Sequence, residues 1–448
     1  MGAGDRTSAD DIRATLWFWP SLWAALSVVV TLALLPIRSE ADRGWASWMW
    51  VGDASTAGTV LEVIATSVMA ATTLTFSLTV VALQIASQQY SPRLLRDFAR
   101  DRKTQGALAF LVSTFVIALV TIRGLQEGRG LPVVAIALSL VMGLLSAGVL
   151  LAFVGHIVRV LRVDNMMLVA HQEASSVMLE TWPPYDARHN DAPQDLLPPN
   201  GGGTLVPAPR SGFVRVIRDP PLVEAAREGS FFIRLRVRAG DHVIAGTPVA
   251  AVWSLDGDAT IDTARVQAAI RKSVEVGFER TVEQDAALGF RQLTDIAVKA
   301  LSPAINDPIT AGHAIGYCAD LLCRLLGRNL APQARSDGQG TVRLVVASRD
   351  LRYFLDLVCS PIRRFGSGEP IVLTALLRML RDCAVAARDD AQRGELRRQA
   401  DRILASMDAG LIDEDASAVR DLHRRFGLAL QGDVDGAYSD RAGETRSI

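Results

Sequence analysis

The feature that most constrains this chain is a set of long apolar runs, all of which lie before about residue 165. An α-helix rises about 1.5 Å per residue, so roughly 20 apolar residues cross the hydrocarbon core of a bilayer. Runs of this kind occupy residues 16–37, 60–86, 108–122 and 132–163, and the third is short enough to need its polar flanks. The sequence therefore predicts a membrane domain over residues 1–165, with four transmembrane helices in the lipid bilayer.

Basic residues in the loops predict the orientation of these helices. They are concentrated between the second and third runs and after the fourth, as Arg93, Arg96, Arg100, Arg102, Lys103, Arg159 and Arg162. Cytoplasmic loops of membrane proteins are enriched in Lys and Arg. We therefore expect a multi-pass protein with both termini, and all of the chain after residue 165, in the cytoplasm.

Charge and motif content argue against several functional classes. Lys and Arg total 47 against 48 Asp and Glu, so the charge balance indicates no nucleic-acid partner. The four cysteines and six histidines show no metal-ligand spacing. The sequence also lacks a P-loop, a Rossmann fingerprint and the common hydrolase motifs. It therefore predicts no metal, no cofactor and no enzyme activity.

The second apolar run carries a polar stripe. At about 100° per residue, its polar side chains fall within one narrow sector of the helix. These residues are Thr59, Glu62, Thr66, Thr73, Ser77, Gln84 and Gln88. Lipid cannot satisfy such groups, so this face must meet other helices or water. Helix packing is one interpretation, because Ser and Thr hydroxyls bond backbone carbonyls or neighbouring helices. The other is a pore lined by copies of this helix.

The fourth run contains a ridge of small residues that would let helices approach closely. Its members recur every four residues and are Ala135, Ser139, Gly143 and Ala147. Ridges of this kind mediate helix association in membranes. We expect either homo-oligomer contacts or packing within one subunit, since both explain the spacing.

The chain after the membrane domain changes character several times. Residues 166–203 read as a helix and a Pro/Gly-rich linker, 204–256 as a small β domain, and 257–432 as a helical domain. Residues 433–448 are polar and are predicted to be a disordered tail. The fold class is thus an α-helical membrane domain followed by a cytoplasmic α+β region.

Two features of the β region bear on function. Residues 237–249 resemble the repeated turn of biotinyl and lipoyl-type small β domains, but the attachment lysine of those domains is absent, so no such cofactor is implied. Arg234, Arg236 and Arg238 alternate with apolar residues, which would place three guanidinium groups on one strand face. A solvated outer face is the ordinary explanation, and an anion site is the alternative.

Residues 280–310 hold the most distinctive polar pattern of the chain. Its members are Arg280, Gln284, Asp285, Gln292, Asp295, Asn306 and Asp307. The spacing predicts Arg280 and Gln284 on one helix face, with Asp285 bonding a neighbouring element. Asp307 before Pro308 predicts an N-cap followed by the first helical residue. A buried network that fixes packing is one interpretation, and a ligand pocket is the other.

Together with Thr73–Ser77, Val81–Gln84 and Tyr90–Arg93 in the membrane domain, the segment Ala300–Pro308 resembles a widespread bacterial family of predicted membrane proteins, known only as a domain of unknown function. The resemblance spans nearly the whole chain. It implies a membrane topology and a location in the bacterial inner membrane, and it assigns no activity.

Three functions from different classes are consistent with these observations. The first is a homo-oligomeric channel that passes ions along the polar stripe and is assembled or gated by the cytoplasmic domain. The second is a membrane-anchored scaffold or signalling protein with a cytoplasmic site for a partner or ligand. A membrane-anchored enzyme is third. A transporter is less favoured than a channel, because the four runs show no broken helix and no paired intramembrane charge.

Overall fold

The computed structural model describes residues 17–38, 50, 52–89, 101–125, 130–160, 162–186, 203–256 and 261–439, and for residues 85–89 it describes the backbone alone. The chain divides into two compact units, residues 1–166 and 167–448. We call the first the helical unit and the second the α+β unit.

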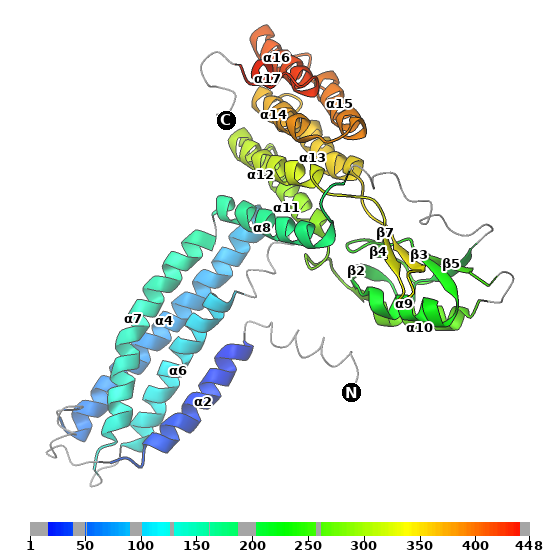
Figure 1. The fold of residues 1–448 in the computed structure, drawn as a ribbon. Helices are drawn as coiled ribbons and strands as arrows, with labels where there is room; N and C mark the ends of the chain where they lie inside the picture. Colours follow the sequence, from blue (N-terminus) through cyan, green and yellow to red (C-terminus); the bar gives the residue numbers. More distant parts are fainter. Residues whose placement is uncertain are drawn as a thin grey trace. The chain divides into compact units, whose positions relative to one another are not determined.

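The helical unit is built from helices that run alongside one another (Figure 1). They are α2 (Phe18–Leu34), α4 (Ala54–Gln89), α6 (Arg102–Gly124) and α7 (Val133–Val160). Helix α6 is central, because it packs against each of the other three and 50% of its apolar stretch is buried. Only 22% of the apolar stretch of α4 is buried, so most of α4 faces away from its own unit.

Three of these helices are long and apolar enough to cross a membrane, namely α4 over Ala54–Gln84, α6 and α7. Helix α2 is also apolar, but it has 17 residues. At 1.5 Å per residue it extends about 25 Å, against about 30 Å for a hydrocarbon core. The structure therefore supports three apolar spans, and the fourth span expected at residues 16–37 stays a prediction.

Polar contacts at both ends of α6 explain why this helix is longer than the predicted residues 108–122. The side chain of Asp101 caps its N-terminus by accepting from the backbone N–H groups of Lys103 and Thr104. His156 Nε2 of α7 lies 2.5 Å from Asp101 Oδ2. At the other end, Arg38 donates to the carbonyl of Gly124 at 2.9 Å, where a cation complements the helix dipole.

The α+β unit contains two sheets. The larger has the order β1-β5-β3-β8-β7 and the smaller the order β4-β2-β6. The strands are β1 (Thr204–Pro207), β2 (Gly212–Ile217), β3 (Phe231–Leu235), β4 (His242–Val243), β5 (Pro248–Ser254), β6 (Val274–Gly277), β7 (Gln333–Ser336) and β8 (Val342–Val346). Neighbouring strands are antiparallel, except that β3 and β8 are parallel.

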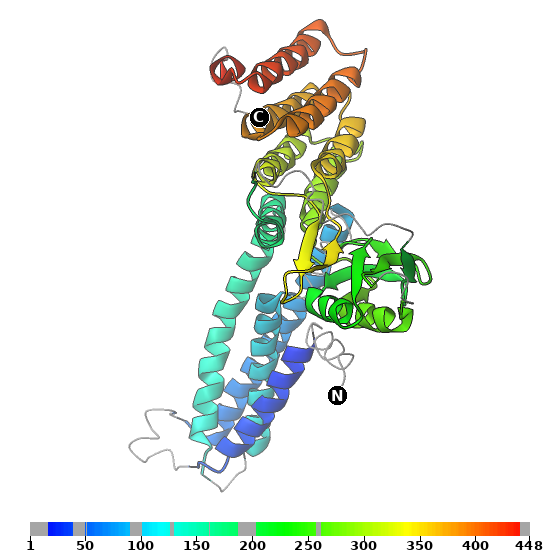
Figure 2. The same ribbon diagram turned by 45° about the vertical axis from the view of Figure 1, so that its right-hand side comes forward.

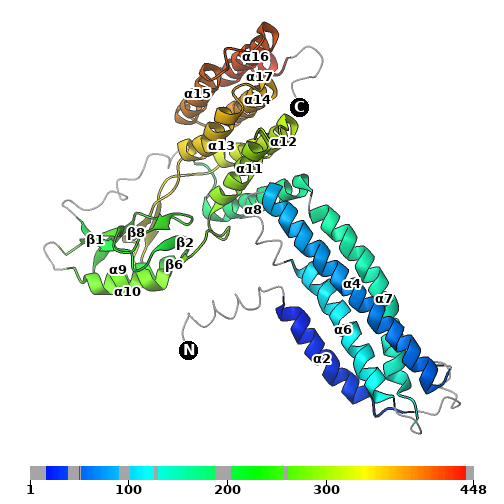
Figure 3. The same cartoon turned by 180° about the vertical axis from the view of Figure 1, so that it is seen from behind.

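Helices α9 (Asp219–Glu228) and α10 (Thr263–Ser273) pack against these strands (Figure 3). Residues such as Leu222 of α9, Ile270 of α10 and Ile233 of β3 share one buried apolar core. Helix α10 is amphipathic, with Val266, Ala269 and Ile270 on its buried side, as its 3- and 4-residue spacing predicts.

The remaining helices form the helical part of the α+β unit. They are α8 (Val163–Thr181), which belongs to this unit from Met167 onward, α11 (Ala286–Ala300), α12 (Pro308–Leu326), α13 (Leu351–Phe365), α14 (Pro370–Ala386), α15 (Asp390–Ala405), α16 (Asp413–Leu430) and α17 (Val434–Tyr438). Aspartates cap several of them, and the predicted cap at Asp307 is confirmed, since its side chain accepts from the N–H of Thr310 at 3.0 Å. The short helix α17 lies inside the stretch expected to be a disordered tail.

The β region is not confined to residues 204–256. Strand β6 follows α10 and pairs with β2, and the β7–β8 hairpin, drawn in yellow, enters the larger sheet beside β3 (Figure 2). The parallel contact between Ile233 and Leu344 joins residues far apart in the chain. The hairpin thereby ties the sheet to the helices that precede and follow it.

Candidate functional site

The polar stripe of α4 faces away from the core of the helical unit. Its described members are all exposed: Thr59, Glu62, Thr66, Thr73, Ser77 and Gln84. The buried residues of α4 are Ala57, Leu61, Ala65, Val68, Thr75, Thr79 and Ala82. At about 100° per residue, the two sets lie on opposite sides of the helix. The side chain of Gln88 lies outside the described residues.

The stripe is a polar strip within an otherwise apolar exposed surface. Val63, Leu74 and Val81 are exposed on one side of it, and Met69 and Phe76 on the other. Two of its hydroxyls bond the preceding turn of the helix, since Thr59 Oγ1 donates to Ser55 O at 3.1 Å and Thr73 Oγ1 donates to Met69 O at 3.0 Å. The described residues of the helical unit thus leave the stripe exposed.

The small-residue ridge of α7 is divided between the interior and the surface of its unit. Ala135 and Ser139 are fully buried. A Cβ added at Gly143 would lie 3.0 Å from Ile64 Cγ2, so this glycine permits close contact with α4 of the same unit. Ala147 is exposed. The ridge thus packs within one subunit at Ala135, Ser139 and Gly143.

In the α+β unit, four charged side chains form a compact cluster. Arg280 donates to Asp285 Oδ2 through Nε at 2.9 Å and through Nη2 at 2.5 Å. Arg349 reaches both Asp285 Oδ1, at 3.4 Å, and Asp241 Oδ1, at 3.0 Å. The side chain of Asp285 has 0% exposure, that of Arg349 8% and that of Arg280 11%. We call these residues, Asp241, Arg280, Asp285 and Arg349, the charged cluster.

Burial raises the pKa of Asp285, and the guanidinium groups of Arg280 and Arg349 offset part of that rise. A carboxylate in this position depends on its partners, because removing one charge of a buried group leaves the others uncompensated. The cluster therefore has the chemistry of a structural network. Of the residues that the sequence grouped in this segment, Arg280 and Asp285 belong to the cluster, and Asp285 bonds Arg349 from a distant part of the chain.

The turn that the sequence likened to biotinyl domains contributes directly to this cluster. Gly240 has a φ of +86°, and a Cβ built on it would lie 2.0 Å from Asp285 Oδ2. Its N–H donates to Val214 O of β2 at 2.7 Å. Only glycine combines this backbone conformation with so close an approach. The turn is therefore shaped by its contact with Asp285.

One local prediction about this segment is wrong. Residues 280–284 are not helical, because strand β6 occupies Val274–Gly277 and α11 begins only at Ala286. Arg280 and Gln284 consequently do not meet on a helix face. Gln284 instead accepts from Ile217 N at 2.8 Å and donates to Ile217 O at 3.2 Å, which continues the hydrogen bonding of β2.

The other residues predicted from this segment do not belong to the charged cluster. Gln292 is buried on α11, and its Oε1 has no hydrogen-bond partner among the described residues. Asp295 lies on the same helix. Asn306 takes a φ of +49°, which suits the turn between α11 and α12. Asp307 then caps α12.

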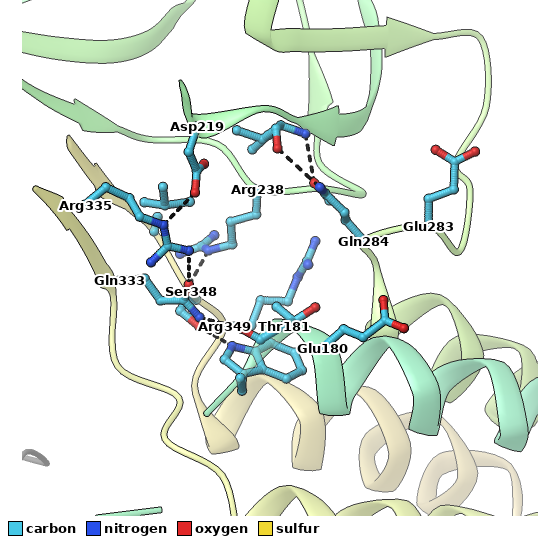
Figure 4. A pocket seen from close by; sticks show the side chains of 15 residues that line it. Glu180, Thr181, Asp219, Arg238, Glu283, Gln284, Gln333, Arg335, Ser348 and Arg349 are labelled. Atoms are coloured by element: carbon cyan, nitrogen blue, oxygen red, sulfur yellow. Dashed lines mark hydrogen bonds and ion pairs between the residues drawn. The ribbon is translucent and has the colours of Figure 1, made fainter. Parts of the chain in front are cut away.

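A polar pocket of about 370 Å³ lies beside the charged cluster (Figure 4). Arg238, Arg335 and Arg349 line it together with Asp219, Glu180 and Glu283, so its charges balance. Arg335 Nε donates to Asp219 Oδ2 at 2.6 Å, and Arg238 Nε donates to Ser348 O at 2.9 Å.

Of the arginines proposed from the sequence for an anion site, only Arg238 lines this pocket. Arg234 and Arg236 are exposed and are not among its lining residues. The sequence analysis missed Arg335 and Arg349, which come from β7 and from the segment after β8. No local signal identifies them, because they reach the site only when the hairpin joins the sheet.

Comparison with known proteins places the chain in a family. The family model described as "Predicted membrane protein (DUF2254)" matches residues 13–382. The chain belongs to this family. An uncharacterized protein of Mycobacterium tuberculosis strain H37Rv is 29% identical over 418 residues, which cover 92% of this chain and 79% of that protein. An uncharacterized protein of Mycobacterium bovis matches equally well.

No solved structure matches the chain. The family match confirms the resemblance to predicted bacterial membrane proteins and supports membrane association. The comparisons give no support to the resemblance to biotinyl and lipoyl domains.

Proposed function

We propose that this member of the DUF2254 family forms a homo-oligomeric ion pore in the bacterial inner membrane, lined by the polar stripe of α4. The observation that carries this proposal is that the stripe lies opposite the buried face of α4. An exposed polar strip in a hydrocarbon environment requires water or another copy of the chain. A ring of subunits supplies both.

The length of the stripe fits a path across the bilayer. From Glu62 to Gln84, at 1.5 Å per residue, the helix extends about 33 Å, close to the thickness of a hydrocarbon core. Glu62 and Gln84 would then stand near opposite mouths of the pore, with Thr66, Thr73 and Ser77 between them. Rings of carboxylates and hydroxyls are groups that select and conduct ions.

Water access to the stripe is the sharpest test. Thr73 and Leu74 are both exposed in a single subunit, but they differ by about 100° around α4. We expect a charged, water-borne thiol reagent to modify Thr73→Cys and to spare Leu74→Cys, which would face lipid. Cys323 is the native cysteine that is not fully buried, so it is replaced by Ser in both variants. Equal labelling of the two variants would contradict the pore.

Conductance provides a second test of the same proposal. In planar bilayers, Ser77→Leu should lower single-channel conductance by narrowing and drying the path. Glu62→Gln should weaken cation preference, because it removes fixed charge at one mouth. If oligomeric wild-type protein carries no current under voltage, tension or a pH step, the proposed pore is contradicted.

The proposal includes α2 as a fourth span, which places both termini and the α+β unit in the cytoplasm. The basic loop at residues 93–103 and the residues after α7 support this orientation. Gly338 is exposed in the β7–β8 turn, and a Cβ there meets no atom within 4 Å. In intact cells, an impermeant reagent should label Gly128→Cys and should leave Gly338→Cys unlabelled. The reverse pattern would overturn the orientation.

A second candidate is a membrane-anchored signalling or scaffold protein, and the polar pocket of the α+β unit favours it. Its balanced charges suit a polar ligand or a partner segment with both signs of charge. If Thr73→Cys is inaccessible to water while Arg335→Ala weakens binding of a cellular ligand, this second function is preferred. A membrane-anchored enzyme stands third, with the same pocket as its site.

A further inference from the structure

The cysteines of the chain lie on three neighbouring helices of the α+β unit. Cys318 and Cys323 belong to α12, Cys359 to α13 and Cys383 to α14. Helix α12 packs against both α13 and α14 (Figure 1). Two of the thiols face each other across the contact between α12 and α14, where Cys323 Sγ lies 3.8 Å from Cys383 Sγ. These two sulfurs are close enough to share a hydrogen bond.

The same distance lies within reach of a covalent bond. A disulfide has a sulfur–sulfur distance of about 2.05 Å, so the two atoms must approach each other by about 1.8 Å. A rotation of about 30° about the Cα–Cβ bond moves a cysteine sulfur by about 0.9 Å. Side-chain rotation at Cys323 and Cys383 therefore covers the distance without a shift of either helix.

The two thiols differ in exposure and in acidity. Cys323 is partly exposed, whereas Cys383 is fully buried. The hydrogen bond between them lowers the pKa of Cys323, and the same bond together with burial raises the pKa of Cys383. Because the thiolate is the form that attacks an oxidant, Cys323 is the reactive member of the pair. Cys383 remains a protonated thiol at its side.

The other two cysteines are poor competitors for an oxidant. Cys318 and Cys359 are completely buried. Burial raises the pKa of both thiols, that of Cys359 to about 12, so they stay protonated at pH 7. Oxidation of the folded chain should therefore begin at Cys323.

We propose that Cys323 and Cys383 form a redox modification site, at which a hydroperoxide converts the two thiols into a reversible disulfide that joins α12 to α14. The pair is placed for this reaction because a partly exposed thiol that meets the oxidant has a buried partner thiol within reach. This site is independent of the proposed pore, so either can fail without the other.

The chemistry takes two steps. The thiolate of Cys323 attacks one oxygen of hydrogen peroxide, so an S–O bond forms and the O–O bond breaks. The hydroxide that leaves takes up the proton that Cys323 had lost and becomes water. Cys383 then attacks the sulfenic acid of Cys323, so an S–S bond forms, the S–O bond breaks, and the departing hydroxide takes the Cys383 proton as a second water. The peroxide is reduced and both thiols are oxidised.

Peroxide treatment of the purified, reduced full chain in detergent tests this site. The treated protein is unfolded, alkylated with N-ethylmaleimide and mapped by mass spectrometry. We expect the wild type to lose two of its four free thiols and to contain a cross-link between Cys323 and Cys383. Dithiothreitol should restore all four thiols, because it reduces disulfides and not sulfinic acids.

Two substitutions on the same helix separate the proposed pair from general oxidation. Cys318→Ala and Cys323→Ala each remove one thiol from α12. Cys318→Ala should form the cross-link as the wild type does, whereas Cys323→Ala should keep its remaining thiols. In Cys383→Ala the reaction should stop at the sulfenic acid of Cys323, which dimedone traps. We expect at least about tenfold more of this adduct than in the wild type, where Cys383 consumes the sulfenic acid.

Several results would overturn the assignment. A wild type that keeps all four thiols in peroxide would show that Cys323 is unreactive. A cross-link that contains Cys318 or Cys359, or one that joins two chains, would show that a different pair reacts. Sulfinic acid at Cys323 of the wild type, without a disulfide, would show that Cys383 does not reach its partner.

Discussion

The polar stripe of α4 and the charged cluster of the α+β unit stand in opposite situations. On α4, Thr66, Thr73 and Ser77 are exposed on the side opposite the buried face. In the charged cluster, Asp285 and Arg349 are almost fully buried and bonded to each other. Polar groups that satisfy one another inside a unit help to specify its fold. Polar groups that face outward from a membrane helix bond their own helix, as Thr73 does, or meet water or another helix. This contrast underlies both the structural role of the cluster and our proposal that the stripe lines a pore.

The largest expected effect comes from breaking the cluster. Asp285→Ala leaves Arg280 without its carboxylate and removes one partner of Arg349, so we expect a loss of about 3–5 kcal/mol in unfolding free energy. Denaturation of the full chain in detergent measures it. Asp390→Asn is the control, because the Asp390 side chain in its ion pair with Arg393 is 99% exposed and should contribute nothing measurable. Equal unfolding free energies for the two variants would show that the cluster does not stabilise the fold.

A smaller effect should come from the glycine that contacts the cluster. Gly240 and Gly246 share a φ of +86°, but an added Cβ would clash with Asp285 only at Gly240. Gly246→Ala should cost only the strain of a positive φ, about 1–2 kcal/mol. Gly240→Ala should cost about 1–3 kcal/mol more, since Asp285 must move from its arginines. Thermal denaturation of both variants isolates the contact, and equal losses would show that backbone strain alone matters.

The cap at Asp307 should have a moderate and pH-dependent effect. Hydrogen bonds from the side chain and backbone of Thr310 lower the pKa of Asp307. An acid with a lowered folded-state pKa contributes stability above its unfolded pKa and loses it as the pH falls through the folded value. Asp307→Ala should therefore cost about 1 kcal/mol at pH 7 and progressively less below about pH 4. A difference that stays constant between pH 7 and pH 3 would exclude this cap.

The smallest effect on stability is expected on the stripe. Thr73 is exposed and its hydroxyl bonds the preceding turn of its own helix, so Thr73→Leu should change the unfolding free energy by less than about 0.5 kcal/mol. Thr75 is fully buried on the opposite face. Thr75→Leu should cost about 1–3 kcal/mol through overpacking. Thr73→Leu should nevertheless reduce conductance. A Thr73→Leu variant that is destabilised but conducts normally would indicate a structural role for the stripe and would contradict the proposed pore.

The sequence alone determined the features that depend on neighbouring residues. Apolar runs predicted the helices of the membrane domain, and periodicity predicted the stripe, because hydropathy and a 3.6-residue repeat are local properties. The cap at Asp307 was predictable for the same reason, since the cap and the N–H groups that it binds lie within one turn.

Contacts between distant parts of the chain determine which partners these features meet. The periodicity of α4 placed Thr73 and Ser77 on one face, but the packing of α6 and α7 decided that this face is exposed. Arg349 bonds both Asp285 and Asp241. These contacts form because the turn at Gly240 and the segment after β8, which are distant in the chain, both pack next to Asp285. Arg335 reaches the polar pocket because β8 pairs in parallel with β3. Contacts of this kind arise from chain folding over long separations, for which a single sequence carries no local signal.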